Sequence, residues 1–124
     1  MDKQNKAFSI RERLKSFVYA SNGIRILIRN EHNARIHLLA TIVIITLGFL
    51  FSISVHEWIV IVLTIGIVIS MEMINSAIEE ICNFISPEKH ESIKRIKDLA
   101  AGAVLVSAII AFIIGVIIFV PKII

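Results

Sequence analysis

The most restrictive feature of this sequence is a set of long apolar runs that carry no charge. Residues 99–120 form a run of 22 uncharged residues. As a helix this run would measure about 33 Å, against the ~30 Å hydrocarbon core of a bilayer. A second run, 38–55, has 18 residues, and a third covers 58–71 before Glu72 interrupts it. We expect these runs to be helical, because backbone polar groups in lipid have to be satisfied within their own segment.

Composition excludes a soluble domain. Hydrophobic residues make up 56% of the 124 residues and charged residues 19%, below the ~25% usual for soluble proteins. A soluble domain of this size cannot cover so much apolar surface, and the same content excludes disorder. The net charge of +3 does not indicate nucleic acid, because the cations flank apolar runs as in proteins anchored to anionic membranes. We therefore expect the lipid bilayer as a partner and no nucleic acid.

The amino-terminal segment predicts an amphipathic surface helix over about 10–30. Its apolar positions recur at helical spacing, and its opposite face is basic. Such a helix lies in the membrane interface; the alternative is a soluble helix docked on a partner. The segment has no early apolar core, so we expect no cleaved signal peptide. The apolar face consists of Ile10, Leu14, Phe17, Ile24 and Ile28, interrupted by Ser21.

Three spans follow within a single membrane-embedded domain, 1–124. The helical pattern of the second run continues past Glu72, and Pro87 ends it. We therefore expect spans at about 34–55, 58–85 and 96–120, which makes the fold class an all-α membrane protein.

The distribution of Lys and Arg predicts the orientation. Of the 13 Lys and Arg residues, only Lys122 follows the third span, and the loop 54–57 has none. The others precede the first span or lie in the second loop, 86–98. By the positive-inside rule the amino terminus and second loop are cytoplasmic and the carboxyl terminus is outside. Trp58 fits an interfacial anchor at the outer end of the second span.

Small residues recur every four positions in the third span. Such a stripe lets helix backbones approach closely in lipid, which favours an oligomer, although an Ala- and Gly-rich helix can show the spacing by chance. The stripe consists of Ala103, Ser107, Ala111 and Gly115.

A polar stripe in the second span is the strongest functional signal. On a helical wheel its members fall within roughly a third of a turn. Ionisable groups inside a membrane helix are costly and usually functional. The alternative is a hydrogen-bond network that only fixes assembly, which would suffice for the amide and hydroxyl groups but not for two carboxylates. The stripe consists of Glu72, Asn75, Ser76, Glu79 and Asn83.

Other polar residues fall at the same membrane level and suggest phosphoryl transfer. A carboxylate from each of two helices and a lysine suit a magnesium-bound nucleotide, and a further carboxylate can take a proton from an attacking hydroxyl. The rival interpretation is a non-enzymatic small membrane protein that uses Glu72 and Glu79 for proton or ion coupling. The chain has no Walker loop or protein-kinase motif, and its four histidines lack zinc-site spacing. The additional residues are Glu31, Glu88, His90, Glu91, Lys97 and Asp98.

Two motifs carry a family resemblance. They are Glu-Met-Ile-Asn-Ser-Ala-Ile-Glu at 72–79 and Lys-Asp-Leu-Ala-Ala-Gly-Ala-Val-Leu at 97–105, supported by Asn30-Glu31 and the segment 19–23. Over about residues 10–120 the chain resembles the prokaryotic diacylglycerol kinases, which are small integral-membrane lipid kinases. The resemblance implies a surface helix, three spans and a homotrimer with active sites shared between neighbouring subunits.

The resemblance also implies roles for individual residues. Glu72 is expected to be the general base on the lipid hydroxyl, with Asn75 beside it in the substrate site. Glu31 and Glu79 are expected to hold the Mg²⁺ of MgATP. Together with these two carboxylates, the expected nucleotide contacts are Tyr19, Glu88, Lys89, His90, Lys97 and Asp98.

Some positions depart from the family pattern and bear on the lipid. Asn83 stands where members often have Asp, so we expect no catalytic role for it. Glu12 stands between Arg11 and Arg13 at a place where the proteobacterial branch has Arg. Whether this chain has the basic contact that Arg provides in that branch is therefore left open. The stretch 33–37 and the form of the 97–103 motif resemble the Gram-positive branch, which includes undecaprenol kinases. We therefore favour undecaprenol as the acceptor, with diacylglycerol as the alternative, in a bacterial cytoplasmic membrane.

Overall fold

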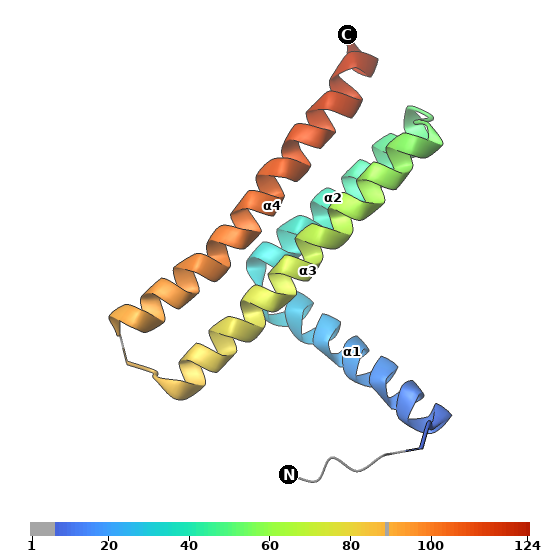
Figure 1. The fold of residues 1–124 in the computed structure, drawn as a ribbon. Helices are drawn as coiled ribbons and strands as arrows, with labels where there is room; N and C mark the ends of the chain where they lie inside the picture. Colours follow the sequence, from blue (N-terminus) through green and yellow to red (C-terminus); the bar gives the residue numbers. More distant parts are fainter. Residues whose placement is uncertain (1–6, 89) are drawn as a thin grey trace.

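Four helices make up the part of the chain that the structure describes. The computed structural model describes residues 7–88 and 90–124. In chain order the helices are α1 (Ile10–Asn30), α2 (His32–Leu50), α3 (Val55–Ile85) and α4 (Glu91–Ile123) (Figure 1). Helices α2, α3 and α4 are each long and apolar enough to cross a membrane. The expected all-α architecture with three candidate spans is confirmed.

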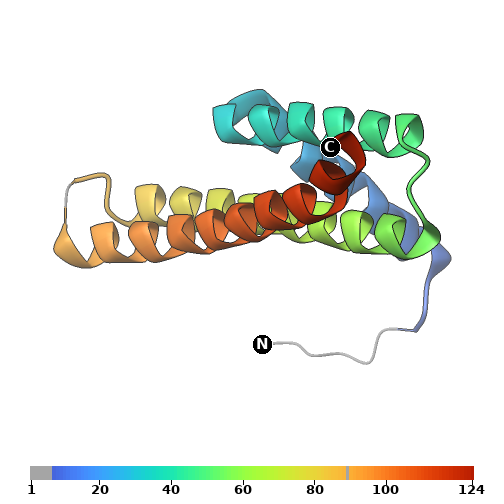
Figure 2. The same cartoon turned by 90° about the horizontal axis from the view of Figure 1, so that it is seen from above.

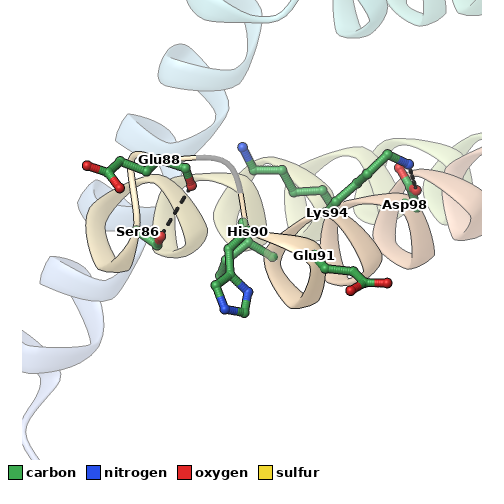
Figure 3. A pocket seen from close by; sticks show the side chains of 8 residues that line it. Ser86, Glu88, His90, Glu91, Lys94 and Asp98 are labelled. Carbon is green, nitrogen blue, oxygen red and sulfur yellow. Dashed lines mark hydrogen bonds and ion pairs between the residues drawn. The ribbon is translucent and has the colours of Figure 1, made fainter.

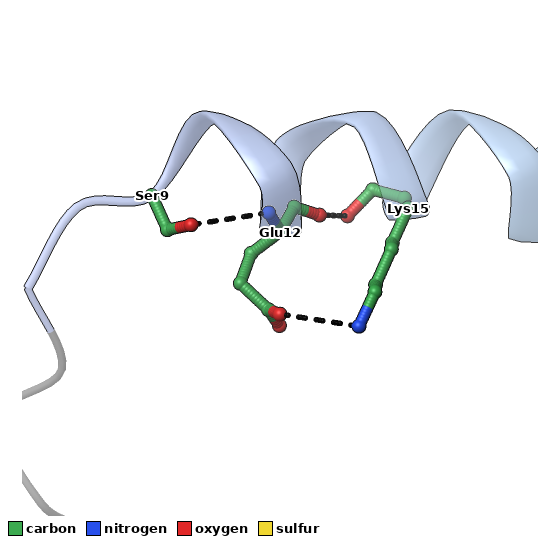
Figure 4. Close-up of polar contacts among 4 residues, drawn as sticks. Ser9, Glu12 and Lys15 are labelled. Atoms are coloured by element: carbon green, nitrogen blue, oxygen red, sulfur yellow. Dashed lines mark hydrogen bonds and ion pairs between the residues drawn. The ribbon is translucent and has the colours of Figure 1, made fainter.

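Helix α1 projects away from the other helices beside the middle of α3 (Figure 1). It begins at a serine cap, because the Ser9 Oγ accepts a hydrogen bond from the Glu12 backbone N–H at 3.3 Å. The Glu12 carboxylate lies 3.7 Å from Lys15 Nζ on the next turn (Figure 4). Most of α1 is exposed, and it meets the bundle near its carboxyl end, where Leu27 is buried and a Cβ on Gly23 would lie 3.6 Å from the Met73 methyl. The last turns of α1 therefore attach it to α3.

A single extended residue, Glu31, separates α1 from α2. Its φ and ψ are −112° and 115°, and its backbone N–H still donates to the Leu27 carbonyl at 3.0 Å. The Arg35 side chain crosses this break: Nε donates to the Ile28 carbonyl at 2.8 Å, and Nη2 donates to the Arg29 carbonyl. Carbonyls at a helix end lack partners within the helix. Arg35 therefore fastens the end of α1 to the start of α2 and places Glu31 at the junction.

Helix α2 ends at Leu50, whereas the expected first span ran to residue 55. The chain leaves the helix through Ser52, whose φ is 49°. The Ser52 N–H donates to the Phe49 carbonyl at 3.3 Å, and the Ile53 N–H donates to the Gly48 carbonyl at 3.1 Å. This pair of bonds is a Schellman motif. A glycine usually takes the left-handed position, and because a serine takes it here, the sequence carried no signal for this helix end.

The main apolar cluster lies next to this turn, at the end of the bundle that we call the core end. The Trp58 ring lies against α2, with its centroid 4.9 Å from that of Phe49. A Cβ on Gly48 would lie only 2.6 Å from Trp58 Cη2, so a larger residue at this position would force the indole ring to shift. Trp58, expected as an interfacial anchor, packs against α2, and its anchoring role stays a prediction. The buried members of the cluster are Ile53, Ile61, Ile118 and Phe119.

Polar contacts at the core end join α3 to α4. The Ser54 Oγ accepts from the Glu57 N–H at 3.2 Å, and Glu57 Oε1 accepts from the Ser54 N–H at 2.9 Å, which forms a capping box. The other carboxylate oxygen, Oε2, lies 3.2 Å from Lys122 Nζ near the end of α4. The first turn of α3 is therefore tied to the last turn of α4.

Most of the apolar surface of the helices faces away from the chain itself. Helices α3 and α4 pack side by side, with α2 on one side of them (Figure 2). Only 11–17% of the most apolar window of each candidate span is buried. In the small-residue stripe, Ser107 is buried, whereas Ala103 is exposed and a Cβ on Gly115 would meet nothing within 4 Å. The stripe remains a prediction about contacts between chains.

Candidate active site

The buried carboxylate of Glu72 lies where α1, α2 and α3 meet. Glu72 is only 2% exposed, and its Oε1 lies 3.3 Å from His37 Nε2 on α2. Both residues line a cavity of about 80 Å³. The rest of the cavity wall is apolar and comes from all three helices. It consists of Ile24, Leu27, Ile28, Ala34, Leu38 and Ile69.

The polar stripe of α3 contains buried atoms without hydrogen-bond partners. Within residues 7–88 and 90–124, these atoms are Glu72 Oε1, Asn75 Oδ1 and Ser76 Oγ. The His37–Glu72 contact has an ion-pair distance but does not complete a hydrogen bond. A buried polar group left without a partner costs about 1–3 kcal/mol. Three such atoms on adjacent turns are suited to a site that receives a polar ligand.

Two further carboxylates lie near Glu72. Glu31 at the α1–α2 junction is close enough to interact electrostatically with both Glu72 and Glu79. Their negative charges repel one another, and a cation among them would relieve this repulsion. Across the described residues, no set of three or more His, Cys, Asp or Glu side chains is placed to hold a metal by itself. The arrangement fits Mg²⁺ that arrives with a nucleotide, since Mg²⁺ needs only one or two carboxylates besides phosphate oxygens.

A second hollow lies beside the connection from α3 to α4 (Figure 3). Its volume is about 520 Å³, within the ~300–1,000 Å³ range of small-molecule sites. Four of the expected nucleotide contacts line it together, and Lys89 lies outside the described residues. These four are Glu88, His90, Lys97 and Asp98.

The start of α4 positions two of these residues. His90 caps the helix, because its Nδ1 accepts from the Ser92 backbone N–H at 3.1 Å. Helix α4 consequently begins at Glu91, ahead of residue 96, where the third span was expected to start. One carboxylate oxygen of Asp98 lies 2.7 Å from Lys94 Nζ (Figure 3). Asp98 therefore already has a cationic partner on its own helix.

Lys97 connects the hollow to the polar stripe. Its Nζ donates to the Asn83 Oδ1 at 2.7 Å across the α3–α4 contact, and it lies within electrostatic range of Glu79. Asn83 was expected to have no catalytic role. In the structure it contacts Lys97, which is one of the residues expected to bind the nucleotide. Its place on the stripe, four residues after Glu79, was a usable signal.

Tyr19, another predicted nucleotide contact, lies apart from the candidate site. Sequence analysis also missed His37, a neighbour of Glu72. Tyr19 is 67% exposed on α1 and lines neither hollow of the candidate site. His37 was considered only as a zinc ligand and set aside. Its position just before the first apolar run, and its polar character, were the available signals.

Comparison with known proteins identifies the family of this chain. The family model for prokaryotic diacylglycerol kinase matches residues 18–119. An undecaprenol kinase from Bacillus subtilis is 41% identical over 122 residues, covering 98% of this chain and 99% of the relative. A diacylglycerol kinase from Synechocystis sp. is 36% identical, covering 82% of this chain and 59% of the relative. One from Escherichia coli K12 is 28% identical, covering 81% and 82%. The chain therefore belongs to the prokaryotic diacylglycerol kinase family of membrane lipid kinases.

Proposed function

We propose that this protein transfers the γ-phosphoryl group of MgATP to a lipid alcohol at the cytoplasmic face of the membrane. The observation that carries the proposal is the burial of Glu72, which is 2% exposed on a helix long enough to span a bilayer. A carboxylate at such a place is costly and is retained for function. The apolar cavity wall around it suits the hydroxyl end of a lipid, whereas ATP requires a polar surface.

In the proposed reaction, Glu72 is the general base. Its carboxylate accepts the proton of the lipid hydroxyl while the hydroxyl oxygen attacks the γ-phosphorus. The lipid O–H bond and the bond from the γ-phosphorus to the bridging oxygen of ADP break, and a new O–P bond forms. Asn75, with its unpaired Oδ1, is suited to orient the hydroxyl.

The remaining residues bind the nucleotide in this proposal. Glu31 and Glu79 would hold Mg²⁺, which when bound neutralises phosphate charge. Lys97, held by Asn83, places a further positive charge toward the phosphates. The other proposed nucleotide contacts are Tyr19, Glu88, Lys89, His90 and Asp98.

We further propose a homotrimer whose active sites are shared between subunits. Tyr19 lies apart from both hollows within one chain, and most of the apolar surface is uncovered. The open side of α4 at Gly115 leaves room for the backbone of a neighbouring helix. These three observations support a site completed by a second copy.

The proposed lipid is undecaprenol, with diacylglycerol as the alternative. A polyprenol has a hydroxyl as its only polar group, which matches a cavity whose wall is apolar except for His37 and Glu72. The direct test is phosphoryl transfer from radiolabelled MgATP in mixed micelles that contain each lipid separately and both together. We expect faster turnover of undecaprenol in competition. Failure to phosphorylate either lipid would contradict the proposed function.

The proposed orientation in the bacterial inner membrane can be tested by cysteine labelling. In a Cys82→Ser background, His56→Cys lies in the first turn of α3 and Ser92→Cys in the first turn of α4. We expect an impermeant maleimide to label position 56 when the outer face is accessible, and position 92 only after the inner membrane is opened. The reverse order would contradict a nucleotide site on the cytoplasmic side.

A further inference from the structure

We propose that His37 is a positioning residue for Glu72. In this assignment, its imidazole Nε2–H donates to the Glu72 carboxylate and holds it toward the lipid hydroxyl. The inference rests on the proposed function, in which Glu72 is the base. The two atoms concerned, His37 Nε2 and Glu72 Oε1, lie 3.3 Å apart and belong to different helices.

The surroundings of Glu72 leave this role to His37. The side chain of His37 is 23% exposed and that of Glu72 is 2% exposed. Among the eight residues that line their cavity, these two alone are polar. A buried carboxylate without a partner is strongly unfavourable. His37 is therefore the side chain in the cavity wall that can fix the direction of the carboxylate.

The contact is close to a hydrogen bond without completing one. Charge-assisted hydrogen bonds between nitrogen and oxygen usually measure about 2.7–2.9 Å, shorter than the 3.3 Å separation here. Catalytic hydrogen bonds are often long without substrate and tighten in the complex. A small rotation of the Glu72 side chain would complete this bond when the lipid hydroxyl enters.

The backbone holds His37 in place for this contact. Ala34, one turn earlier on α2, is buried against the same cavity, and the Thr41 Oγ1 donates to the His37 carbonyl at 2.8 Å. The Arg35 bonds to the end of α1 also hold this part of α2. The imidazole therefore projects from a segment anchored on both sides.

The test compares His37→Leu with His37→Gln. Leucine removes the donor, whereas the glutamine amide nitrogen reaches the place of Nε2. For His37→Leu we expect kcat to fall about tenfold to a hundredfold, as for loss of one hydrogen bond to a charged group, while the KM for MgATP stays unchanged. His37→Gln is expected to stay within about threefold of the parent. His56→Leu, at the core end, is the matched control for the loss of a histidine.

Equal losses in both His37 variants, or no loss in either, would overturn the proposal. Elution volume and thermal unfolding show whether each variant is folded and assembled. If His37→Leu is unstable, the decisive measurement is residual turnover in a Glu72→Gln background. In that background, His37→Leu is expected to cause no further loss of turnover. An additional loss as large as the one that His37→Leu causes in the parent would overturn the proposal, because His37 would then act independently of Glu72. Full activity of Glu72→Gln alone would instead remove Glu72 as the base, which contradicts the proposed function itself.

Discussion

The two ends of the bundle are built on opposite principles. At the core end, the Schellman turn, the capping box and the Glu57–Lys122 pair satisfy their polar groups, and four buried apolar residues pack together. The other half, which we call the site end, extends from Glu72 to the α3–α4 connection and also holds Glu31, Glu79 and Lys97. Among its described residues three buried polar atoms lack partners, and it contains the two hollows of the candidate site. The same helices α3 and α4 therefore concentrate their stability at one end and leave binding capacity at the other.

This difference indicates how a small membrane enzyme can keep costly groups in its site. Unsatisfied buried groups lower stability, and the fold tolerates them when other contacts secure the helices. The core end supplies such contacts close to the turn that joins α2 to α3. Substitutions at the site end are therefore expected to change turnover, and substitutions at the core end to change unfolding.

The largest effect is expected from Glu72→Gln. The amide keeps the shape of the side chain but cannot accept the hydroxyl proton, so kcat should fall by at least ~10²-fold. Thermal stability is expected to remain equal or to rise, because a neutral group replaces a buried carboxylate. Turnover is measured with labelled MgATP, and unfolding by circular dichroism. A kcat within a few-fold of the parent would show that Glu72 is not the base.

A smaller effect on turnover is expected from Glu79→Gln or Glu31→Gln. Each variant loses one carboxylate from a site suited to a hard cation. We expect the KM for MgATP to rise about tenfold, comparable with loss of a charge-assisted hydrogen bond, and excess Mg²⁺ to restore part of the rate. Titrations of Mg²⁺ at fixed ATP test this. A change confined to the KM for the lipid would contradict the metal assignment.

At the core end, Gly48→Ala is expected to lower stability without loss of kcat. The added Cβ would lie 2.6 Å from Trp58 Cη2, so the indole has to move, at a cost of about 1–3 kcal/mol for overpacking. Gly66→Ala is the matched control, since its Cβ would meet nothing within 4 Å. Unfolding in a denaturing detergent titration measures both. Equal stability of the two variants would show that the indole moves away from the added Cβ without cost, contrary to this prediction.

The smallest effect is expected from Lys122→Met. This variant breaks the 3.2 Å pair with Glu57 but leaves the capping box in place. Solvent screens an ion pair of this kind and leaves it a small contribution to stability, so unfolding should shift slightly and turnover should not. Lys15→Met removes the more exposed pair with Glu12 and serves as the control. A larger shift for Lys15→Met would reverse the ranking of the two pairs.

Sequence patterns predicted the long helices well, because each helix follows from the composition of its own segment. Uncharged runs of 18 and 22 residues cannot satisfy their backbone in lipid except as helices. The helix ends were harder to predict. Ser52 takes a left-handed conformation that normally identifies a glycine, and the start of α4 depends on a histidine cap at His90.

Within the candidate site, the residues on one helix were predictable and their partners on other helices were not. Helical spacing placed Glu72, Asn75 and Glu79 on one stripe of α3. The approach of His37 to Glu72 depends on how α2 lies against α3, and the bond from Lys97 to Asn83 depends on how α3 pairs with α4. Periodicity within one helix holds no information about either packing.

The Glu57–Lys122 pair has an electrical consequence. A lone charge that crosses an energised membrane gains or loses about 2.3 kcal/mol for each 100 mV of transmembrane voltage. Glu57 and Lys122 carry opposite charges 3.2 Å apart at the same end of the bundle, so the work done by the voltage on one nearly cancels the work done on the other. The packing of α3 against α4 at this end is therefore expected to stay the same when the cell energises or depolarises its membrane.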